Sequence, residues 1–452
     1  GSIIRTAEHF LTHDVFVQGL RKHLNNKAYN SATADDLFAA LQEAADDAEV
    51  DLNVTRIMES WTRQAGYPLI TANRTSNGSI HITQERFLLS GESEADPKTT
   101  WWVPITYTRK NSIDFTTTKP NVWLENEPQV DIATKLADDE WFILTIQETA
   151  FYRVLYDEQN YKLLIDYLNS ENHNKIHLLN KAQLLDDSLN LARAGLIKYA
   201  TALDLTTYLA RETDYIPWVS YFSGLTFLNS RLAGTEDYDN FKSYVLNLTD
   251  ALYNTVQFTA PANDEHTRKL LRTITLTWAC NFDKQKCLDS ASEFFTQWKD
   301  GNNSVNSIPP DLRSVVYCSA LSNGGEEQWN FLWDQYKKSD VATDQVLILA
   351  ALGCTKNATL LNRYLQNSIT PDSGIRTQDS QSVFSAVYSR AEGVDVAFKF
   401  LTDKIEDIKN YYTAMNAIRN IISGIASRRT TEKQREEVKA QNSLLFNIQM
   451  KS

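Results

Sequence analysis

The stretch Asn180–Leu191, which reads NKAQLLDDSLNL, places its apolar side chains on one face of a helix. Similar stretches of roughly 10–15 residues, each followed by a short polar break, recur from about residue 158 through Ile425. Helices of this length with short connections favour pairs that stack on one another. The sequence therefore predicts an α-solenoid of the HEAT or armadillo type over residues 158–452.

Residues 66–157 follow the two-residue period of β-strands instead. The breaker Gly66-Tyr67-Pro68 opens this segment, and Asn77-Gly78 is typical of a hairpin turn. Several short strands at close spacing favour a small β-sandwich. Runs rich in β-branched and aromatic residues predict these strands at residues 70–71, 79–83, 87–89, 101–108 and 141–146.

Two adjacent tryptophans allow a test of the strand interpretation. Neighbouring side chains on a strand point to opposite faces. We therefore expect one of Trp101 and Trp102 in the core, and the other against a neighbour or in solvent.

Residues 1–65 have helical spacing, with a first helix that begins near Ile3 and is interrupted at His13-Asp14. Thr33 is the predicted N-cap of a second helix, with Asp36 at its third helical position. The predicted fold is therefore mainly α with a small β-sandwich. Its predicted parts are helices over 1–65, the sandwich over 66–157 and the solenoid over 158–452.

The composition is typical of a folded chain with an acidic surface. The chain has 452 residues, of which 42% are hydrophobic, and a formal net charge of −12. Such a surface repels a phosphate backbone on average, so we expect no nucleic-acid partner. The longest apolar run, Val346–Cys354, has about half the length that a bilayer span needs. No signal peptide opens the chain, so we expect a fragment without its membrane anchor, in which Gly1-Ser2 is native or a cloning scar.

Four cysteines and six Asn-x-Ser/Thr acceptors favour an oxidising, secretory compartment. Four buried, reduced thiols are the alternative interpretation of the cysteines. We expect the chain outside the cell, at the plasma membrane or secreted. The acceptors predict exposed glycosylation sites at Asn53, Asn73, Asn77, Asn247, Asn302 and Asn357.

Six short motifs lie in order along the chain: WTRQAGYPLI (61–70), FYRVLYD (151–157), NKAQLLDD (180–187), YIPW (215–218), LRSVVYC (312–318) and GGEEQW (324–329). Together they resemble the C-terminal half of the aminopeptidase N family of zinc metallopeptidases. The second motif and the residue before it depart from the family, with Ala150 in place of Gly and Leu155 in place of Asn. The resemblance is greatest to insect members, and the helical part resembles an endoplasmic-reticulum-aminopeptidase-type C-terminal domain.

The resemblance implies a parent enzyme that removes one N-terminal residue from a peptide. Zinc would polarise the carbonyl and activate water, a Glu would act as the base, and a Tyr would stabilise the oxyanion. The resemblance places all of these groups upstream of Gly1. We therefore expect no catalytic residue, metal ligand or cofactor on this chain, with zinc held by the parent enzyme.

The same resemblance implies roles that need no chemistry. The helical part would close the substrate chamber of its own upstream catalytic domain and contact the peptide. Asn420 is a tentative peptide contact, with an ordinary helix residue as the alternative. Disulfides Cys280–Cys287 and Cys318–Cys354 are also implied. The alternative is a function of another class, in which the chain is a receptor surface recognised by a toxin, a virus or an antibody.

His9 and His13 have the i, i+4 spacing at which two imidazoles on one helix can share a zinc ion. The residue after the first histidine is Phe10 rather than a general-base Glu, and Ala32 stands where the family has its third ligand. We therefore interpret both as histidines on a helix surface.

Two further patterns have simple interpretations. His173 and His177 lie in a polar loop, so we expect both in solvent. The segment Gly324-Gly325-Glu326-Glu327 is interpreted as a helix start, because carboxylates are favourable at the positive end of the helix dipole.

Overall fold

The computed structural model of the protein describes residues 1–90, 99–259, 261, 263–301, 306–412 and 415–440. These residues form a mainly helical fold with small β-sheets, in agreement with the predicted class. The chain divides into two compact units, Gly1–Leu225 and Thr226–Ser452, and the division falls within helix α8 (Tyr215–Leu232). The changes from helix to strand and back again, at residues 62–68 and 156–158, lie inside the first unit.

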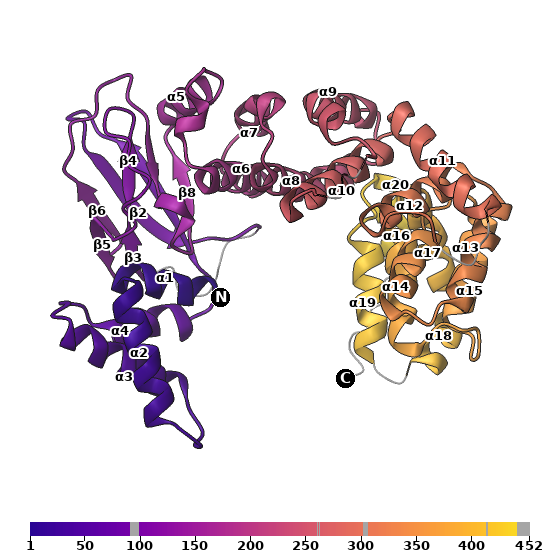
Figure 1. Ribbon diagram of the computed structural model, residues 1–452, viewed down its shortest axis with the longest axis horizontal. Coiled ribbons are helices and arrows are strands. Elements are labelled where there is room, and N and C mark those ends of the chain that lie inside the picture. Colours follow the sequence, from indigo (N-terminus) through magenta and orange to yellow (C-terminus); the bar gives the residue numbers. More distant parts are fainter. Residues whose placement is uncertain (91–98, 260, 262, 302–305, 413–414, 441–452) are drawn as a thin grey trace. The chain divides into compact units, whose positions relative to one another are not determined.

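The first unit begins with helices α1 to α4 (Figure 1). They are α1 (Ser2–Leu11), α2 (His13–Asn26), α3 (Ala34–Asp47) and α4 (Val54–Thr62). Thr12, with a φ of 76°, ends α1 and separates it from α2, one residue before the predicted interruption.

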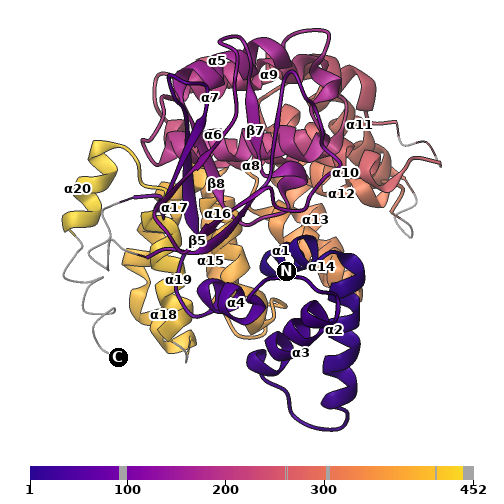
Figure 2. The ribbon, with the colours of Figure 1, turned by 90° about the vertical axis from the view of Figure 1, so that its left-hand side faces the viewer.

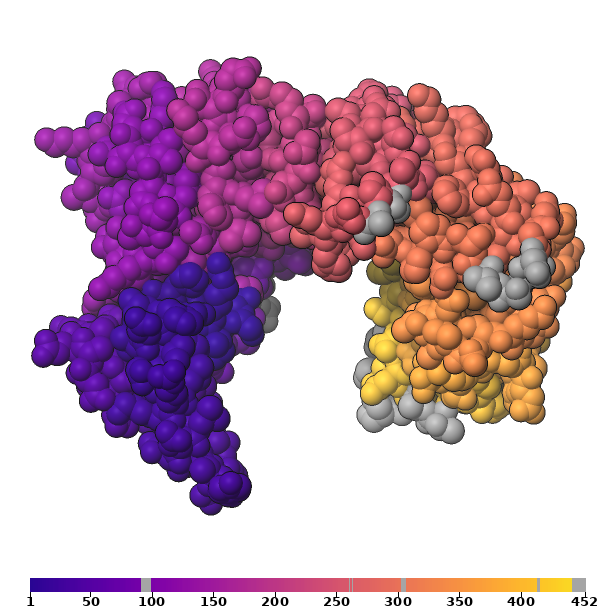
Figure 3. Space-filling model, viewed as in Figure 1, coloured from indigo at the N-terminus to yellow at the C-terminus, as the bar shows by residue number. Residues whose placement is uncertain are grey.

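The start of α3 is a capping box. The Thr33 hydroxyl accepts a hydrogen bond from the N–H of Asp36 at 3.3 Å, and the Asp36 carboxylate accepts from the N–H of Thr33 at 2.8 Å. The predicted N-cap is therefore confirmed. The connection from α2 to α3 protrudes from the unit (Figure 3), and Tyr29 within it is fully exposed.

The largest sheet has the strand order β6-β2-β1-β8, and the pairs β3-β5 and β4-β7 form two small antiparallel sheets. β1 pairs antiparallel with β2 and parallel with β8. Gly78, with a φ of 79°, lies in the turn between β1 and β2, so the predicted hairpin is confirmed. The strands are β1 (Pro68–Arg74), β2 (Ile80–Arg86), β3 (Trp102–Ile105), β4 (Tyr107–Arg109), β5 (Val122–Glu125), β6 (Gln129–Ile132), β7 (Phe142–Leu144) and β8 (Arg153–Tyr156).

The prediction of a strand at residues 87–89 is wrong, since β2 ends at Arg86. Phe87 donates its N–H to the carbonyl of Tyr67 at 3.0 Å, which extends the β1–β2 pairing by one residue, and its ring packs on that of Tyr67, with 5.6 Å between the ring centroids. Strands β5, β6 and β8 were not predicted. β6 is an edge strand whose residues are mostly polar or exposed, and β8 pairs with a strand far away in the sequence.

The tryptophan prediction is confirmed. Trp101 is fully buried, whereas Trp102 is half-buried and packs edge-on against Trp123, with 6.3 Å between the ring centroids. The guanidinium of Arg56 on α4 lies over the Trp102 ring at 5.3 Å. These contacts join the first helices to the strands.

The strands are followed by helices α5 (Glu158–Leu168), α6 (Leu178–Arg193), α7 (Tyr199–Thr206) and the first part of α8. Among these helices, α6 packs on strand β8, whereas α1–α4 lie apart from them at the bottom of the view in Figure 2. Asn180 on α6 donates to the carbonyl of Thr145 at 2.8 Å and accepts from the N–H of Gln147 at 2.9 Å. Arg153 on β8 reaches the carboxylate of Asp187 on α6 at 3.0 Å. Polar side chains on α6 therefore hold β8, and the segment between β7 and β8, against this helix.

The second unit is helical throughout its described residues, around a continuous apolar core that includes Trp298 and Trp329. Neighbouring helices in the sequence pack together in space, for example α11 with α12 and α16 with α17. The helices are α9 (Tyr238–Val256), α10 (His266–Asn281), α11 (Gln285–Asp300), α12 (Arg313–Asn323), α13 (Glu326–Lys338), α14 (Ala342–Leu352), α15 (Ala358–Ser368), α16 (Ser380–Tyr388), α17 (Ala391–Asp403), α18 (Ile405–Tyr411), α19 (Met415–Ala426) and α20 (Glu432–Ala440).

Within the part of the chain that the structure describes, no helix combines the length and the hydropathy that crossing a membrane requires.

Candidate functional site at the Cys318–Cys354 bridge

Both disulfides that the resemblance implied are present in the second unit. Cys280–Cys287 joins the end of α10 to α11 across 7 residues of sequence. Cys318–Cys354 joins α12 to the residue that follows α14 and its terminal Gly353, across 36 residues. The second bridge therefore fixes two helices that are separated along the chain by α13.

The two bridges are expected to differ in their effect on stability. A disulfide restricts the unfolded chain more strongly when it closes a longer loop, which gives about 2.5 kcal/mol for the short bridge and about 4 kcal/mol for the long one. Cys318→Ser should therefore lower the free energy of unfolding more than Cys280→Ser. Urea unfolding of the two variants measures the difference, and an equal or reversed order would contradict the loop-length argument.

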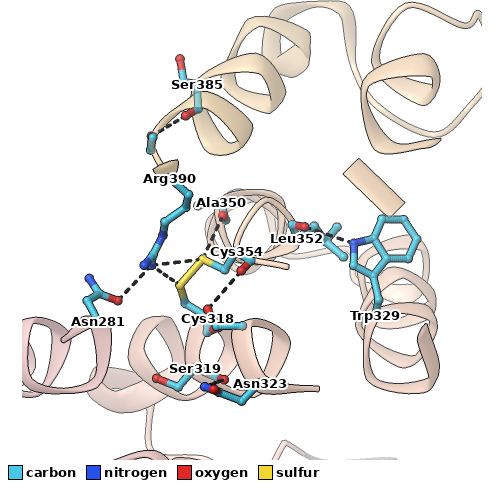
Figure 4. The surroundings of a disulfide bond; sticks show 12 residues. Asn281, Cys318, Ser319, Asn323, Trp329, Ala350, Leu352, Cys354, Ser385 and Arg390 are labelled. Atoms are coloured by element: carbon cyan, nitrogen blue, oxygen red, sulfur yellow. Dashed lines mark hydrogen bonds between the residues drawn. A yellow bond between two sulfur atoms is a disulfide. The ribbon is translucent and has the colours of Figure 1, made fainter. Parts of the chain in front are cut away.

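Arg390 is the residue immediately before α17, and its guanidinium contacts the sulfur atoms of the long bridge, Cys318–Cys354 (Figure 4). Its Nη2 lies 2.6 Å from Cys318 Sγ and 3.5 Å from Cys354 Sγ, and donates to Asn281 Oδ1 at 2.9 Å. Nε and Nη1 have no hydrogen-bond partner among the described residues. The site therefore holds a cation with unused donors.

The charge of Arg390 is not neutralised by an ion pair. Within the described residues, no carboxylate lies within 4.0 Å of its guanidinium. Burial lowers the pKa of Arg390, and the charges of Glu392 and Asp283 act against this shift only from longer range. Lys356 and Lys242, which are also near Asp283, each have an ion pair with it.

A cavity of about 440 Å³ opens beside this guanidinium. Its walls are mainly apolar, with a set of small hydroxyl side chains. Asp379 also lines the cavity, but its carboxylate is paired with Arg376 at 2.6 Å. The apolar wall includes Val315, Val346, Leu347, Leu349, Ala350 and Ala386, and the hydroxyls are those of Thr277, Ser314, Ser319, Ser382, Ser385 and Ser389.

A second cavity, of about 670 Å³, shares Cys280, Asn281, Cys354, Ser389 and Arg390 with the first. Its lining is polar and of mixed charge, with four further cations and four carboxylates. The charged residues are Lys242, Lys356, Arg428 and Lys433, and Asp283, Glu392, Asp395 and Glu437. The first cavity suits an apolar group with one negative charge, whereas the second does not select a charge.

The structure separates the two histidines that have zinc-ligand spacing. His9 lies on α1 and its Nδ1 is 2.9 Å from the Thr118 hydroxyl, whereas His13 begins α2 and its Nδ1 is 2.7 Å from the Glu8 carboxylate. The break at Thr12 means that they do not share one helical face. In the described ranges, no group of three or more His, Cys, Asp or Glu side chains is arranged to hold a metal ion.

The expectation that His173 and His177 lie in solvent is wrong, because both are half-buried. His177 is the N-cap of α6, where its Nδ1 accepts from the N–H of Leu179 at 3.3 Å. A histidine is an unusual N-cap, so the sequence carried no clear signal for this role. Glu326 and Glu327 lie in the first turn of α13, as predicted.

Asn420 is exposed on α19, and its side-chain amide donates to Gln381 Oε1 at 3.4 Å. It does not line either cavity. Glycosylation stays a prediction: Asn302 lies outside the described residues, and the remaining acceptors are exposed, namely Asn53, Asn73, Asn77, Asn247 and Asn357.

Sequence reasoning did not find Arg390. Its partners lie 72 and 36 residues away in the chain, so no local motif marks the site. The only available signal was an isolated arginine shortly after the second cysteine pair, and that pattern is too common to be informative.

Residues 141–443 match the family of the ERAP1-like C-terminal domain, and the chain belongs to that family. Among its relatives, aminopeptidase N of Plutella xylostella is 35% identical over 445 residues, which cover 97% of this chain and 46% of the relative. Aminopeptidase N of Rattus norvegicus is 32% identical over 98% of this chain and 46% of its own length. Membrane alanyl aminopeptidase of Heliothis virescens is 32% identical over 95% and 43%. The chain thus spans about half the length of these relatives, which is consistent with the C-terminal half of an aminopeptidase N.

Proposed function

We propose that this chain is the non-catalytic C-terminal portion of a zinc aminopeptidase that removes N-terminal residues from peptides. Its helices of residues 1–65 would complete the catalytic domain, followed by a β-sandwich and an α-solenoid that closes the substrate chamber. The family match over residues 141–443 and the aminopeptidase relatives support this proposal. The two disulfides and the exposed glycosylation acceptors support a place outside the cell.

The zinc ion of such an enzyme would be held by the upstream catalytic domain. Among the residues that the structure describes, the histidine pair does not fit the metal, because His9 and His13 lie on separate helices and each already has another partner. No catalytic step is therefore assigned to this chain. Its own contribution would be to receive and position the peptide.

The cavity beside Arg390 is the part of the chain that suits a peptide end. Arg390 has a positive charge without an ion-pair partner and two donor groups without acceptors, next to an apolar wall. A terminal carboxylate would accept hydrogen bonds from the guanidinium, while an apolar last side chain would occupy the cavity. This unpaired arginine is the observation that supports a peptide-binding role for the second unit.

Titration of the full chain with fluorescent peptides tests this role. A peptide with a free C-terminal carboxylate and an apolar last residue should bind at least about tenfold more tightly than its C-terminal amide, because a charge-assisted hydrogen bond contributes about 1.5–3 kcal/mol. Arg390→Gln should remove this preference. Lys356→Gln is the matched control, and Asn420→Ala tests the tentative contact.

Equal binding of acid and amide would contradict the pocket assignment. The role in chamber closure has a separate test, in which the chain is added to the catalytic half of a relative. Association should change the preference for peptide length while affecting the hydrolysis of a single-residue amide less. Association without that change would favour the alternative function, a receptor surface for a protein ligand such as a toxin.

A further inference from the structure

The two disulfides of the second unit have different chemical surroundings. In the short bridge, Cys280 lines both cavities although it is 4% exposed, whereas Cys287 is fully buried in the core and lines neither, so a thiolate formed at Cys287 would lie among apolar side chains. Cys318 is half-buried, and both it and Cys354 line the cavity beside Arg390. The long bridge therefore has both of its cysteines on the wall of the first cavity and both of its sulfurs within 3.5 Å of the Arg390 guanidinium, and among the described residues Arg390 makes no such contact with the short bridge.

The position of Arg390 determines which sulfur can leave as an anion. Its Nη2 is 2.6 Å from Cys318 Sγ but 3.5 Å from Cys354 Sγ. A neighbouring guanidinium stabilises a thiolate, and a more stable thiolate is a better leaving group in disulfide exchange. Since no carboxylate is paired with Arg390, its charge is available for this role.

We propose that Cys318–Cys354 is a redox-reactive bridge, which dithiol reductants open in preference to Cys280–Cys287, with Cys318 leaving as the thiolate beside Arg390. A thiolate of the reductant attacks Cys354 Sγ and forms a mixed disulfide, while the electron pair of the protein S–S bond moves to Cys318 Sγ. The second thiol of the reductant, after losing its proton, attacks the reductant's own sulfur in the mixed disulfide. Cys354 is released as a thiolate and takes up a proton, and the dithiol is oxidised to a disulfide by two electrons.

Other contacts hold the end of α14 to α12 and to α13 after the bridge opens. The Ser322 hydroxyl donates to the carbonyl of Cys354 at 3.1 Å, and the Trp329 indole donates to the carbonyl of Leu352 at 3.1 Å. Opening would therefore change the charge beside the cavity without dismantling its wall. A thiolate paired with Arg390 would compete with a ligand carboxylate, a consequence that rests on the proposed function.

Differential alkylation of the full chain tests the proposal. The chain is incubated with dithiothreitol over a series of concentrations and times, quenched with an alkylating reagent, and mapped by mass spectrometry. The long bridge should open at least about fivefold faster than the short one. With glutathione as the monothiol, the mixed disulfide should form on Cys354 rather than on Cys318.

The variant Arg390→Gln should slow the opening of Cys318–Cys354 by at least about fivefold and leave Cys280–Cys287 unchanged. A purely structural role of Arg390 predicts the opposite sign, since a loosened site would expose the bridge and speed its opening. Arg390→Lys should restore part of the rate, and Lys356→Gln should have no effect. Equal opening of both bridges, or no effect of Arg390→Gln, would overturn the proposal, whatever the outcome of the peptide titration.

Discussion

Glu212→Gln is expected to lower the free energy of unfolding of the first unit by about 3–5 kcal/mol. The Glu212 carboxylate lies 2.8 Å from the ammonium of Lys181 on α6, and only 8% and 5% of the two side chains are exposed. Glutamine can still accept a hydrogen bond but cannot neutralise the charge. The substitution therefore leaves Lys181 charged in a poorly solvated position.

Urea unfolding followed by circular dichroism measures this loss. The double variant Lys181→Met/Glu212→Gln removes both charges and should recover most of the stability, because the penalty arises from the uncompensated ion. Glu406→Gln, in an exposed pair with Lys409, is the matched control and should leave the stability nearly unchanged. Equal losses for Glu212→Gln and Glu406→Gln would show that burial does not matter here.

The same pair makes the stability depend on pH in the acid range. Burial alone would raise the pKa of Glu212, but hydrogen bonds from Lys181 and from the N–H groups of Asp214 and Thr213 outweigh it and hold the pKa below the ordinary value of 4.5. The folded chain then binds this proton less tightly than the unfolded chain. The stabilising contribution of Glu212 is present above pH 4.5 and is lost as the pH falls through the lower folded-state pKa. Glu212→Gln should abolish this part of the acid dependence.

Local signals in the sequence predicted the elements that local chemistry determines. The capping box at Thr33 and Asp36, the turn at Asn77-Gly78 and the opposite environments of Trp101 and Trp102 follow from spacing within a few residues. The cysteine pairing came from the family resemblance rather than from spacing. The mainly helical class followed from the apolar period, which is a property of each helix by itself.

Features that depend on distant partners could not be predicted in the same way. β8 pairs in parallel with β1, although the other strands lie between them in the sequence. The motif that contains β8 was interpreted only as a family signature. Phe87 lies one residue past the end of β2 and packs on Tyr67, the residue before β1, rather than starting a new strand. The pair Lys181–Glu212 and the contact of Arg390 with Cys318 join residues 31 and 72 positions apart. Such contacts follow from how helices stack, which periodicity alone does not specify.

Trp329→Ala is expected to lower the free energy of unfolding of the second unit by about 3–5 kcal/mol, because it opens a cavity in a closely packed core. The Trp329 side chain on α13 is 1% exposed. Its ring stacks on Trp333 with 5.6 Å between the centroids and meets Tyr364 edge-on at 6.0 Å. Its indole N–H donates to the carbonyl of Leu352 at 3.1 Å (Figure 4).

Trp329→Phe separates packing from the hydrogen bond. Phenylalanine fills much of the space but leaves the Leu352 carbonyl without its donor, so a smaller loss of about 1–3 kcal/mol is expected. Leu352 lies two residues before Cys354, so Trp329 and the long disulfide hold the same end of α14. Combining Trp329→Ala with Cys318→Ser should therefore give a loss that differs from the sum of the two single losses by at least about 0.5 kcal/mol. Strict additivity in urea unfolding would mean that the bridge and the indole act on α14 independently.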